Sequence, residues 1–379
     1  KKAKAGFQLD IASIQPRLQA ARGAVNRLQQ IQIATPVTLV MQEKTDSEPF
    51  AHILARGDYA SPGERVPAGV PAVLPPLEPG AKANRLALAH WLVNPDNPLP
   101  ARVTTNRFWL ELFGNGIVST PEDFGSQGVP PSHIELLDWL AAEFIDSDWN
   151  MKHMYKLMLM SSTYRQATTI SEEELKIDPD NLLLARGPRY RLDAEVIRDQ
   201  ALFISGLMDD DQVGGHPVKP YQPQGVWKAV AYSNSNTKEF RADTGNKLYR
   251  RSLYTFWKRS APPPSMAIFD APSRESCSVQ RERTNTPLQA LVLMNDPQFV
   301  EAARHLATLT LKAERDDRFA ALYVRAMGNE PDEQQLTIMK DTYQQVLPSY
   351  IENPDLAEQL LTIGDSPADD SLDPAVLAA

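Results

Sequence analysis

Proline limits what this chain can fold into more than any other residue type. It supplies 31 of the 379 residues, about 8% of the chain against a usual value of about 5%. Because proline fixes φ and has no amide hydrogen to donate, it disrupts the interiors of helices and of central strands. The sequence therefore predicts many short elements joined by loops of fixed shape.

The distribution of these prolines suggests how the chain is divided. The run from 61 to 82 is rich in proline and is predicted to be an extended linker with polyproline character. Before it, residues 1–60 are predicted to form an N-terminal helix plus a small β unit. After it, residues 83–347 form the main helical domain. Residues 348–379 are acidic and are predicted to be a loose C-terminal segment of a chain that continues in the whole protein.

Hydrophobic periodicity predicts mostly helices. Residues 9–32 have apolar positions three and four apart, as in an amphipathic helix, whereas 35–43 and 50–59 alternate as strands do. Residues 168–180 are polar and acidic and are predicted to be an exposed connection. The same helical spacing appears in nine further segments, at 85–93, 101–113, 132–144, 151–161, 193–207, 287–294, 297–312, 319–327 and 333–346.

Capping residues support four of these helix starts. Ser132 and Glu135 have the spacing of a capping box, and Asn150 precedes the methionine-rich helix. Thr286 and Asp296 each stand directly before a proline, and proline favours the first position of a helix. The predicted fold class is mainly α (α+β), with a large helical domain and a small N-terminal β-containing unit.

Composition excludes several classes of protein. Apolar residues make up 42% and charged residues 23% of the chain, which argues against wholesale disorder. No apolar run approaches the length of a membrane span, so none is predicted in this fragment. A net charge of −9 and a pI near 5.3 argue against nucleic acid as a partner.

The chain lacks the motifs of common cofactor sites and hydrolases. Its single cysteine, Cys277, excludes an internal disulfide, a cysteine zinc site and a CxxCH haem attachment. The six histidines do not have the spacing of a metal site, and no P-loop, GxSxG or GxGxxG occurs. We therefore predict no metal and no cofactor in this chain.

The most unusual stretch is the basic segment 247–297. Between Lys247 and Arg283 it has eight basic and three acidic residues, a local charge of 8 − 3 = +5 inside an acidic chain. Residues 252–257 are rich in aromatic and β-favouring types, and 247–285 is predicted to be a central extended segment. Such a segment is either a buried ion-pair hub or a site for an anion.

Aromatic faces stack on sugars, and guanidinium groups bind carboxylate or sulfate through two hydrogen bonds. The candidate ligand-binding residues of this kind in and beside the basic segment are Tyr221, Trp227, Arg250, Arg251, Tyr254, Trp257, Arg259 and Arg274. The alternative is that the same groups form an internal polar core.

Two carboxylates among these arginines are candidate catalytic residues. Asp270 and Glu275 could serve as acid and base of a hydrolase acting on polysaccharide, which requires two carboxyl groups facing one cleft. The alternative is that each neutralises a neighbouring arginine.

Several long strings resemble one family. In the basic segment they are YRRSLYTFWKR (249–259), FDAP (269–272) through Cys277, and TNTPLQAL (284–291). Upstream they are the runs at 106–109, 123–125, 131–140, 161–166, 191–195 and 220–223. The chain is similar to the planctomycete-type, cytochrome-associated domain numbered 1553 among the domains of unknown function.

That resemblance implies a location and a partner. Such domains are found C-terminal to a cytochrome-c-like domain in exported proteins, so we expect a periplasmic or extracytoplasmic protein. Haem c would belong to an upstream domain that is absent from this chain. The family supplies no catalytic residues to carry over.

Residues and resemblance together favour an accessory binding module over an enzyme. The predicted partner is an anionic polysaccharide or a partner protein. Two alternatives stay open, namely a polysaccharide-acting hydrolase that uses the carboxylate pair, and a structural scaffold that docks a haem domain.

Overall fold

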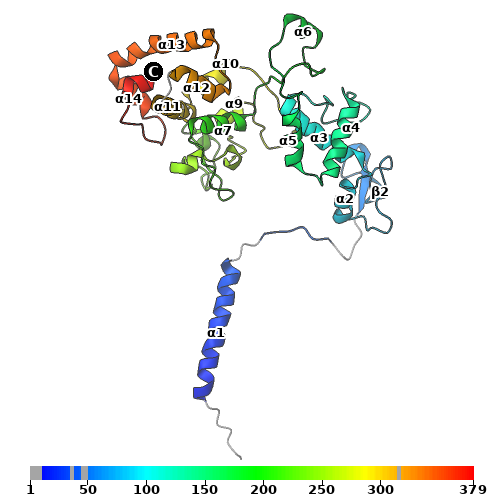
Figure 1. Cartoon of the computed structure of the whole chain (residues 1–379). Coiled ribbons are helices and arrows are strands. Elements are labelled where there is room, and N and C mark those ends of the chain that lie inside the picture. Colours follow the sequence, from blue (N-terminus) through cyan, green and yellow to red (C-terminus); the bar gives the residue numbers. More distant parts are fainter. Residues whose placement is uncertain (1–10, 35–37, 44–49, 314–316) are drawn as a thin grey trace, which may run out of the picture. The chain divides into compact units, whose positions relative to one another are not determined.

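The computed structural model describes residues 11–34, 38–43, 50–313 and 317–379, which are mainly α-helical (Figure 1). Within the described residues the only sheet is a pair of antiparallel strands near the N-terminus. The predicted fold class, mainly α with a small β-containing unit, is therefore confirmed. The chain divides into two compact units between Pro100 and Ala101. No described helix has the length and apolarity needed to cross a membrane.

The described part of the first unit contains two α-helices and the sheet. Its described elements are α1 (Ile11–Ala34), β1 (Phe50–Leu54), β2 (Pro62–Pro67) and α2 (Arg85–Leu92), with a 3₁₀ turn at Ala55–Gly57. The predicted N-terminal helix is confirmed as α1, although residues 9 and 10 lie outside the described residues. At the start of α2, the Asn84 side chain accepts a hydrogen bond from Ala87 N at 2.9 Å.

The sheet differs from the prediction. Residues 38–43 form no strand, and 35–37 lie outside the described residues. The partner of β1 is instead β2, which comes from the proline-rich run predicted to be a linker, with Phe50 opposite Pro67 and His52 opposite Arg65. A two-stranded sheet has only edge strands, and edges tolerate proline. The prolines at both ends of β2 therefore do not prevent pairing.

The second unit is built from helices joined by long loops. Its first helix, α3, begins just before the division. The elements are α3 (Pro98–Phe113), α4 (Ile134–Asp146), α5 (Met151–Met160), α6 (Glu172–Ile177), α7 (Ala194–Ser205), α8 (Val226–Ala229), α9 (Pro264–Ile268), α10 (Pro287–Asn295), α11 (Pro297–Lys312), α12 (Arg318–Met327), α13 (Glu333–Glu352), α14 (Pro354–Leu361) and α15 (Pro374–Ala378).

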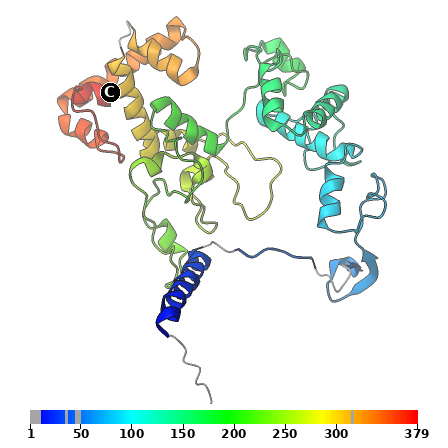
Figure 2. The same ribbon diagram turned by 60° about the horizontal axis from the view of Figure 1, so that its bottom comes forward.

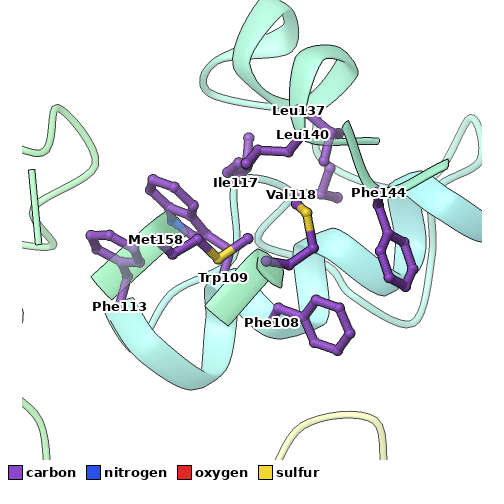
Figure 3. Close-up of a cluster of buried hydrophobic side chains, with 10 residues drawn as sticks. Phe108, Trp109, Phe113, Ile117, Val118, Leu137, Leu140, Phe144 and Met158 are labelled. Carbon is purple, nitrogen blue, oxygen red and sulfur yellow. The ribbon is translucent and has the colours of Figure 1, made fainter. Parts of the chain in front are cut away.

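One hydrophobic core lies between α3, α4 and α5 (Figure 3). Phe108 and Trp109 of α3 pack with Leu140 and Phe144 of α4 and with Met158 of α5. Met154 and Met158 thus fill the core, as methionine often does, whereas Met151 and Met160 of the same helix are exposed. Buried Asn106 fixes the loop after α3, because its amide donates to Val118 O at 3.1 Å and accepts from Val118 N at 2.9 Å.

A second core forms around α7 and α11, which pack against each other (Figure 2). Leu202 of α7 and Ala302 of α11 contact Leu248 and Tyr249 of the basic segment. Helices α13, α14 and α15 pack on one another, and α15 also contacts α11. The basic segment therefore crosses the main packing surface of this unit.

Most predicted helix starts are confirmed, but one cap is wrong. Asn150 accepts from His153 N at 3.1 Å, and Asp296 accepts from Gln298 N at 3.1 Å. Thr286 N donates to Gln289 Oε1 at 3.2 Å, which completes a capping box there. Ser132 makes no cap. Its hydroxyl donates to Ile117 O at 3.3 Å, and α4 begins two residues later with His133 at the N-cap position.

Two loop predictions also need correction. The polar stretch 168–180 is mostly exposed, as predicted, but it also contains the short helix α6, which begins with a capping box of Ser171 and Glu174. Residues 252–257 form no strand. They contain a 3₁₀ turn at Ser252–Tyr254 followed by an isolated bridge from Thr255 to Val218. The segment 247–285 is therefore not extended throughout, and it also contains α9.

The C-terminal segment 348–379 is ordered rather than loose. Helix α13 runs through Pro348 to Glu352, and α14 and α15 bury Leu361 and Leu377. Ser366 N and Oγ each donate to the Glu301 carboxylate at 2.7 Å. The acidic composition does not predict this order, because the segment is held by residues that are distant in the sequence, such as Glu301.

Candidate binding site

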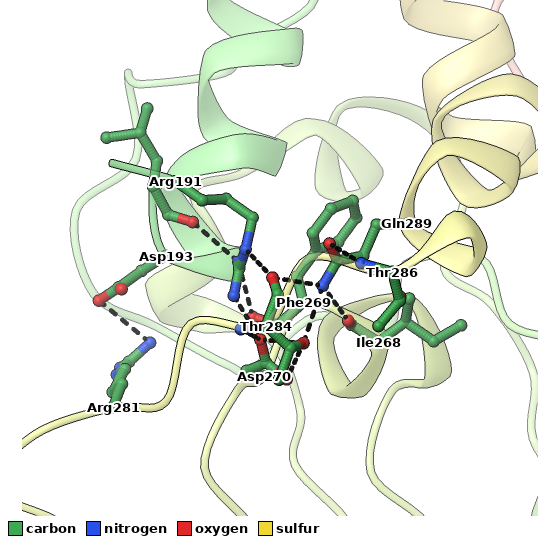
Figure 4. A network of polar contacts seen from close by, with 10 residues as sticks. Arg191, Asp193, Ile268, Phe269, Asp270, Arg281, Thr284, Thr286 and Gln289 are labelled. Atoms are coloured by element: carbon green, nitrogen blue, oxygen red, sulfur yellow. Dashed lines mark hydrogen bonds and ion pairs between the residues drawn. The ribbon is translucent and has the colours of Figure 1, made fainter. Parts of the chain in front are cut away.

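A loop from Asp270 to Thr284, here called the basic loop, is closed at its two ends by a polar network (Figure 4). The Asp270 carboxylate accepts from Thr284 N at 2.8 Å and from Thr284 Oγ1 at 2.9 Å, and it pairs with Arg191. Arg191 also donates to Phe269 O and to Thr284 O, each at 3.1 Å. The ends of the loop are thus fixed to the segment before α7.

Gln289 of α10 strengthens this closure. Its amide donates to Ile268 O at 3.0 Å and to Thr284 O at 3.2 Å (Figure 4). Asp270 and Arg274 have φ values of 60° and 63°, in a region that residues other than glycine visit uncommonly. Such a backbone persists when surrounding contacts determine it, and the network supplies these contacts at Asp270. The fixed backbone sets the directions in which the arginines of the loop point.

Arg274 and Arg281 of the basic loop meet at one carboxylate. The Arg274 guanidinium lies over the Trp257 ring, 4.5 Å from its centroid, and its Nη2 is 3.8 Å from Glu195 Oε1. Arg281 Nη1 is 2.5 Å from Glu195 Oε2 and 3.4 Å from Asp193 Oδ2. Partial burial alone would lower the pKa of Arg281, but these two carboxylates hold it above its ordinary value.

Arg283, two residues further on, has a different environment. Its guanidinium lies 4.4 Å from the centroid of the Tyr190 ring, and its Nη1 donates to Gly114 O at 3.0 Å. Its Nε is buried and has no hydrogen-bond partner. Among the described residues, no carboxylate lies within 4.0 Å of Arg283. We call Arg274, Arg281 and Arg283 the arginine track.

Arg283 lines a cavity of about 270 Å³, the Arg283 pocket. Tyr190, Glu111, Asp193 and Arg281 also line it, together with residues 278–280. The Tyr190 hydroxyl donates to Glu111 O. Gly114 is required beside it, because φ there is +84° and a Cβ would lie 2.7 Å from the Tyr190 ring. Partial burial, together with the charge of Asp193, raises the pKa of the Glu111 carboxyl.

Four of the predicted ligand-binding residues lie inside the protein or bind other parts of it. Trp227 is 1% exposed and packs on Phe240 and Phe256. Arg250 is buried, donates to His216 O at 3.0 Å and to Gln212 O at 3.1 Å, and lies over the Tyr254 ring. Tyr254 Oη accepts from Gly214 N, and Tyr221 donates to Glu301.

The other four predicted ligand-binding residues reach the surface. Arg251 lies 3.4 Å from Asp210, and Arg259 lies 3.4 Å from Glu275. Trp257 and Arg274 are in contact, as described above. Among the described residues, the structure therefore brings together two pairs of the predicted set, Arg250 with Tyr254 inside the protein and Arg274 with Trp257 at the surface.

The two predicted catalytic carboxylates have unlike surroundings. Asp270 is one-sixth exposed, and its oxygens are used by Arg191 and Thr284, whereas Glu275 is largely exposed beside Arg259. Their assignment as acid and base stays a prediction. Within the described residues, no three histidine, cysteine, aspartate or glutamate side chains are grouped as metal ligands.

Sequence reasoning missed most of the pocket. No motif in the sequence selects Tyr190 and Glu111 of the pocket or Glu195, the carboxylate partner of Arg281, and Arg281 and Arg283 enter only as charges without a role. One signal was available, because Asp193 and Glu195 belong to the string at 191–195 that carries the family resemblance. The two acids Asp193 and Glu195, which follow two arginines in the run from Arg189 to Glu195, could have pointed to a partner for the basic loop.

Comparison with known proteins identifies the family of this chain through a family model alone. No curated protein and no solved structure matches the chain significantly. A family model matches residues 84–343, which include α2, both hydrophobic cores, the basic loop and the Arg283 pocket. Because this match covers well over half of the chain, the protein belongs to the family described as "Protein of unknown function (DUF1553)", or PSD1.

Proposed function

We propose that this chain is a non-catalytic module that binds an acidic polysaccharide and that the acidic group of one sugar unit is held by Arg283. The observation that supports the proposal is that the Arg283 guanidinium is partly buried and has no carboxylate partner within the described residues. Arg283 is partly buried on Tyr190, one of its nitrogen atoms is buried without a partner, and no carboxylate of the described chain pairs with it. A desolvated cation of this kind gains from an anionic ligand.

The remainder of the pocket suits hydroxyl groups. Glu111 and Asp193 supply carboxylate acceptors in the lining, where Arg281 pairs with Asp193. A sulfate-dense polymer would meet these acids unfavourably, whereas a uronate presents one carboxylate and several hydroxyls. The mixed charge of the pocket therefore favours a uronic acid over a heavily sulfated sugar.

The size of the pocket limits what enters it. Its volume of about 270 Å³ falls below the range of about 300–1,000 Å³ that drug-sized ligands occupy. One sugar unit fits this space better than a longer segment. Neighbouring units of the polymer would lie along the arginine track, where the Arg274 side chain is 44% exposed over Trp257.

The setting of the module follows from the family resemblance. We propose that it acts outside the cytoplasm, beside a cytochrome-c-like domain that carries the haem. In that arrangement this chain supplies attachment to the polymer, and any electron transfer takes place on the upstream domain.

Affinity electrophoresis tests the proposal with polygalacturonate as the uronic polymer, dextran sulfate as the sulfated one and dextran as the neutral control. Polygalacturonate should retard the wild-type protein most. Arg283→Gln should weaken binding about tenfold, because one charge-assisted contact is lost. Trp257→Ala should weaken it less.

The matched control is Arg251→Gln, an exposed arginine that pairs with Asp210 outside the track. Its affinity should equal that of the wild type. Thermal unfolding of all variants separates loss of binding from loss of fold. The proposal is wrong if neither acidic polymer retards the wild-type protein, or if a folded Arg283→Gln variant binds as the wild type does.

A further inference from the structure

Helix α1 (Ile11–Ala34) has an apolar stripe that the described chain leaves exposed. Ile14, Leu18, Ala21, Val25 and Leu28 follow one another at intervals of four, three, four and three residues. This is the heptad spacing of helices that pair side by side. The exposed fractions are 42% for Ile14, 44% for Leu18, 52% for Val25 and 64% for Leu28. The residues that would meet a partner helix are thus uncovered.

The residues that weaken a helix lie away from this stripe. Pro16 and Gly23 are both in α1, seven residues apart. At 100° per residue they fall on the side opposite Leu18 and Val25. Proline and glycine each reduce the stability of an isolated helix, and helices in proteins are stabilised mostly by packing of the apolar face. A partner along the stripe would supply that packing.

The charges of α1 indicate what kind of partner fits. Its charged residues are Arg17, Arg22 and Arg27, and it contains no acidic residue. Arg17 lies on one side of the stripe and Arg22 on the other, at the positions that form ion pairs between paired helices. Two copies of α1 would place only like charges there, which disfavours self-pairing. An acidic helix would form attractive pairs on both sides.

A membrane surface is the other class of partner for a basic amphipathic helix. Such helices have a wide apolar face with a strongly charged opposite face. The stripe of α1 is narrow, within about 40° on either side of its centre at 100° per residue. The face opposite the stripe carries Pro16, Gly23 and uncharged residues with Arg27 alone. We infer that α1 is one half of a helix–helix interface whose other half is an acidic amphipathic helix of a partner protein.

Two synthetic four-heptad peptides test this inference on the full chain. Both have leucine at the a and d positions, and one has glutamate and the other lysine at the e and g positions. Fluorescence anisotropy should show that the glutamate peptide binds about tenfold more tightly than the lysine peptide. Added salt should reduce this preference, since exposed charges are screened.

Two variants separate the stripe from the charges. Leu18→Asp combined with Val25→Asp should abolish binding of the glutamate peptide. Arg17→Glu combined with Arg22→Glu keeps the stripe intact and should reverse the preference toward the lysine peptide. The second variant keeps the test decisive even if the first prevents α1 from forming, which circular dichroism would show.

Three results would overturn the inference. The first is failure of both peptides to bind, and the second is equal binding of both. The third is tighter binding to phosphatidylglycerol vesicles than to the glutamate peptide, which would assign α1 to a membrane surface. Sedimentation equilibrium adds a fourth check, because a dimer of the wild-type chain that Leu18→Asp disrupts would indicate self-pairing instead.

Discussion

The two halves of the basic segment use their arginines in opposite ways. In the inner half, 247–256, Arg250 is buried and its Nη1 and Nη2 donate to backbone carbonyls of the loop 212–216, although its Nε, like that of Arg283, has no partner. In the outer half, 257–284, Arg274 and Arg283 lie on aromatic rings at the protein surface or in a pocket. A run of like residues therefore divides into a structural part and a part available to a ligand.

The difference lies in what surrounds each half. The inner half crosses the packed surface of α7 and α11, so its polar groups must find partners within the protein. Arg198 of α7 donates to Leu248 O at 2.6 Å and to Arg250 O at 2.9 Å, and Glu301 of α11 accepts from Tyr249 at 2.8 Å. The basic loop of the outer half is closed at its ends by Asp270 and Thr284. Between these ends, Arg274 and Arg281 pair with carboxylates near the surface, and Arg283 has no carboxylate partner within the described residues.

Arg198→Met should give the largest loss of stability. Burial lowers the pKa of Arg198 to about 10, which leaves it charged at neutral pH, and its loss would leave buried carbonyls of the inner half without donors. Urea unfolding at pH 7 should show a loss of about 4 kcal/mol. Arg251→Met, at an exposed neighbouring arginine, should change stability by less than about 0.5 kcal/mol. Similar values for both variants would contradict the division into two halves.

Glu301→Gln should give the second largest loss of stability, about 3 kcal/mol at pH 7. The Glu301 carboxylate is 1% exposed and accepts hydrogen bonds from Tyr221, Tyr249 and Ser366. Burial alone would raise the pKa of Glu301, but the hydrogen bonds from Ser366 and from the tyrosines outweigh it and hold the pKa below its ordinary value.

The lowered pKa of Glu301 also predicts how the effect of Glu301→Gln on stability changes with pH. A carboxyl with a lowered folded-state pKa stabilises the fold above its unfolded pKa of about 4.3 and loses that contribution as the pH falls through the folded value. The difference in stability between wild type and Glu301→Gln should therefore be constant from about pH 5 to 7 and shrink below pH 4. A difference that grows on acidification would refute the assignment. Exposed Glu275→Gln is the control.

Much of the helical fold could be predicted from the sequence, because its signals are local. Asn150 and Asp296 cap helices through bonds to residues two or three positions away. The failure at Ser132 shows the limit, since its hydroxyl has a competing partner in Ile117, fifteen residues earlier. The order of 348–379 was missed for the same reason, because Ser366 binds Glu301, sixty-five residues away.

The candidate site was harder to predict than the fold. Composition showed that the basic segment was unusual, but it could not show which arginines face inward. Arg283 bonds to Gly114, 169 residues earlier, and Arg281 bonds to Glu195, 86 residues earlier. Pairings over such distances depend on how α3 and α7 are placed in the fold. The spacing of residues within the basic segment does not predict that placement.

Arg274→Ala should have the smallest effect on stability. A small effect would show that this arginine of the outer half does not hold the fold together. Its ion pair with Glu195 is long, at 3.8 Å, and its side chain is 44% exposed. A cation–π contact of such a guanidinium contributes about 0.5–1 kcal/mol. We expect a loss of stability of under about 1 kcal/mol and binding to polygalacturonate about threefold weaker. Arg259→Ala, whose arginine is 64% exposed beside Glu275, should change neither quantity measurably. If Arg274→Ala lowered stability as much as Glu301→Gln does, the outer half would be structural as well. Its arginines would then hold the loop in place and would not be available to a ligand.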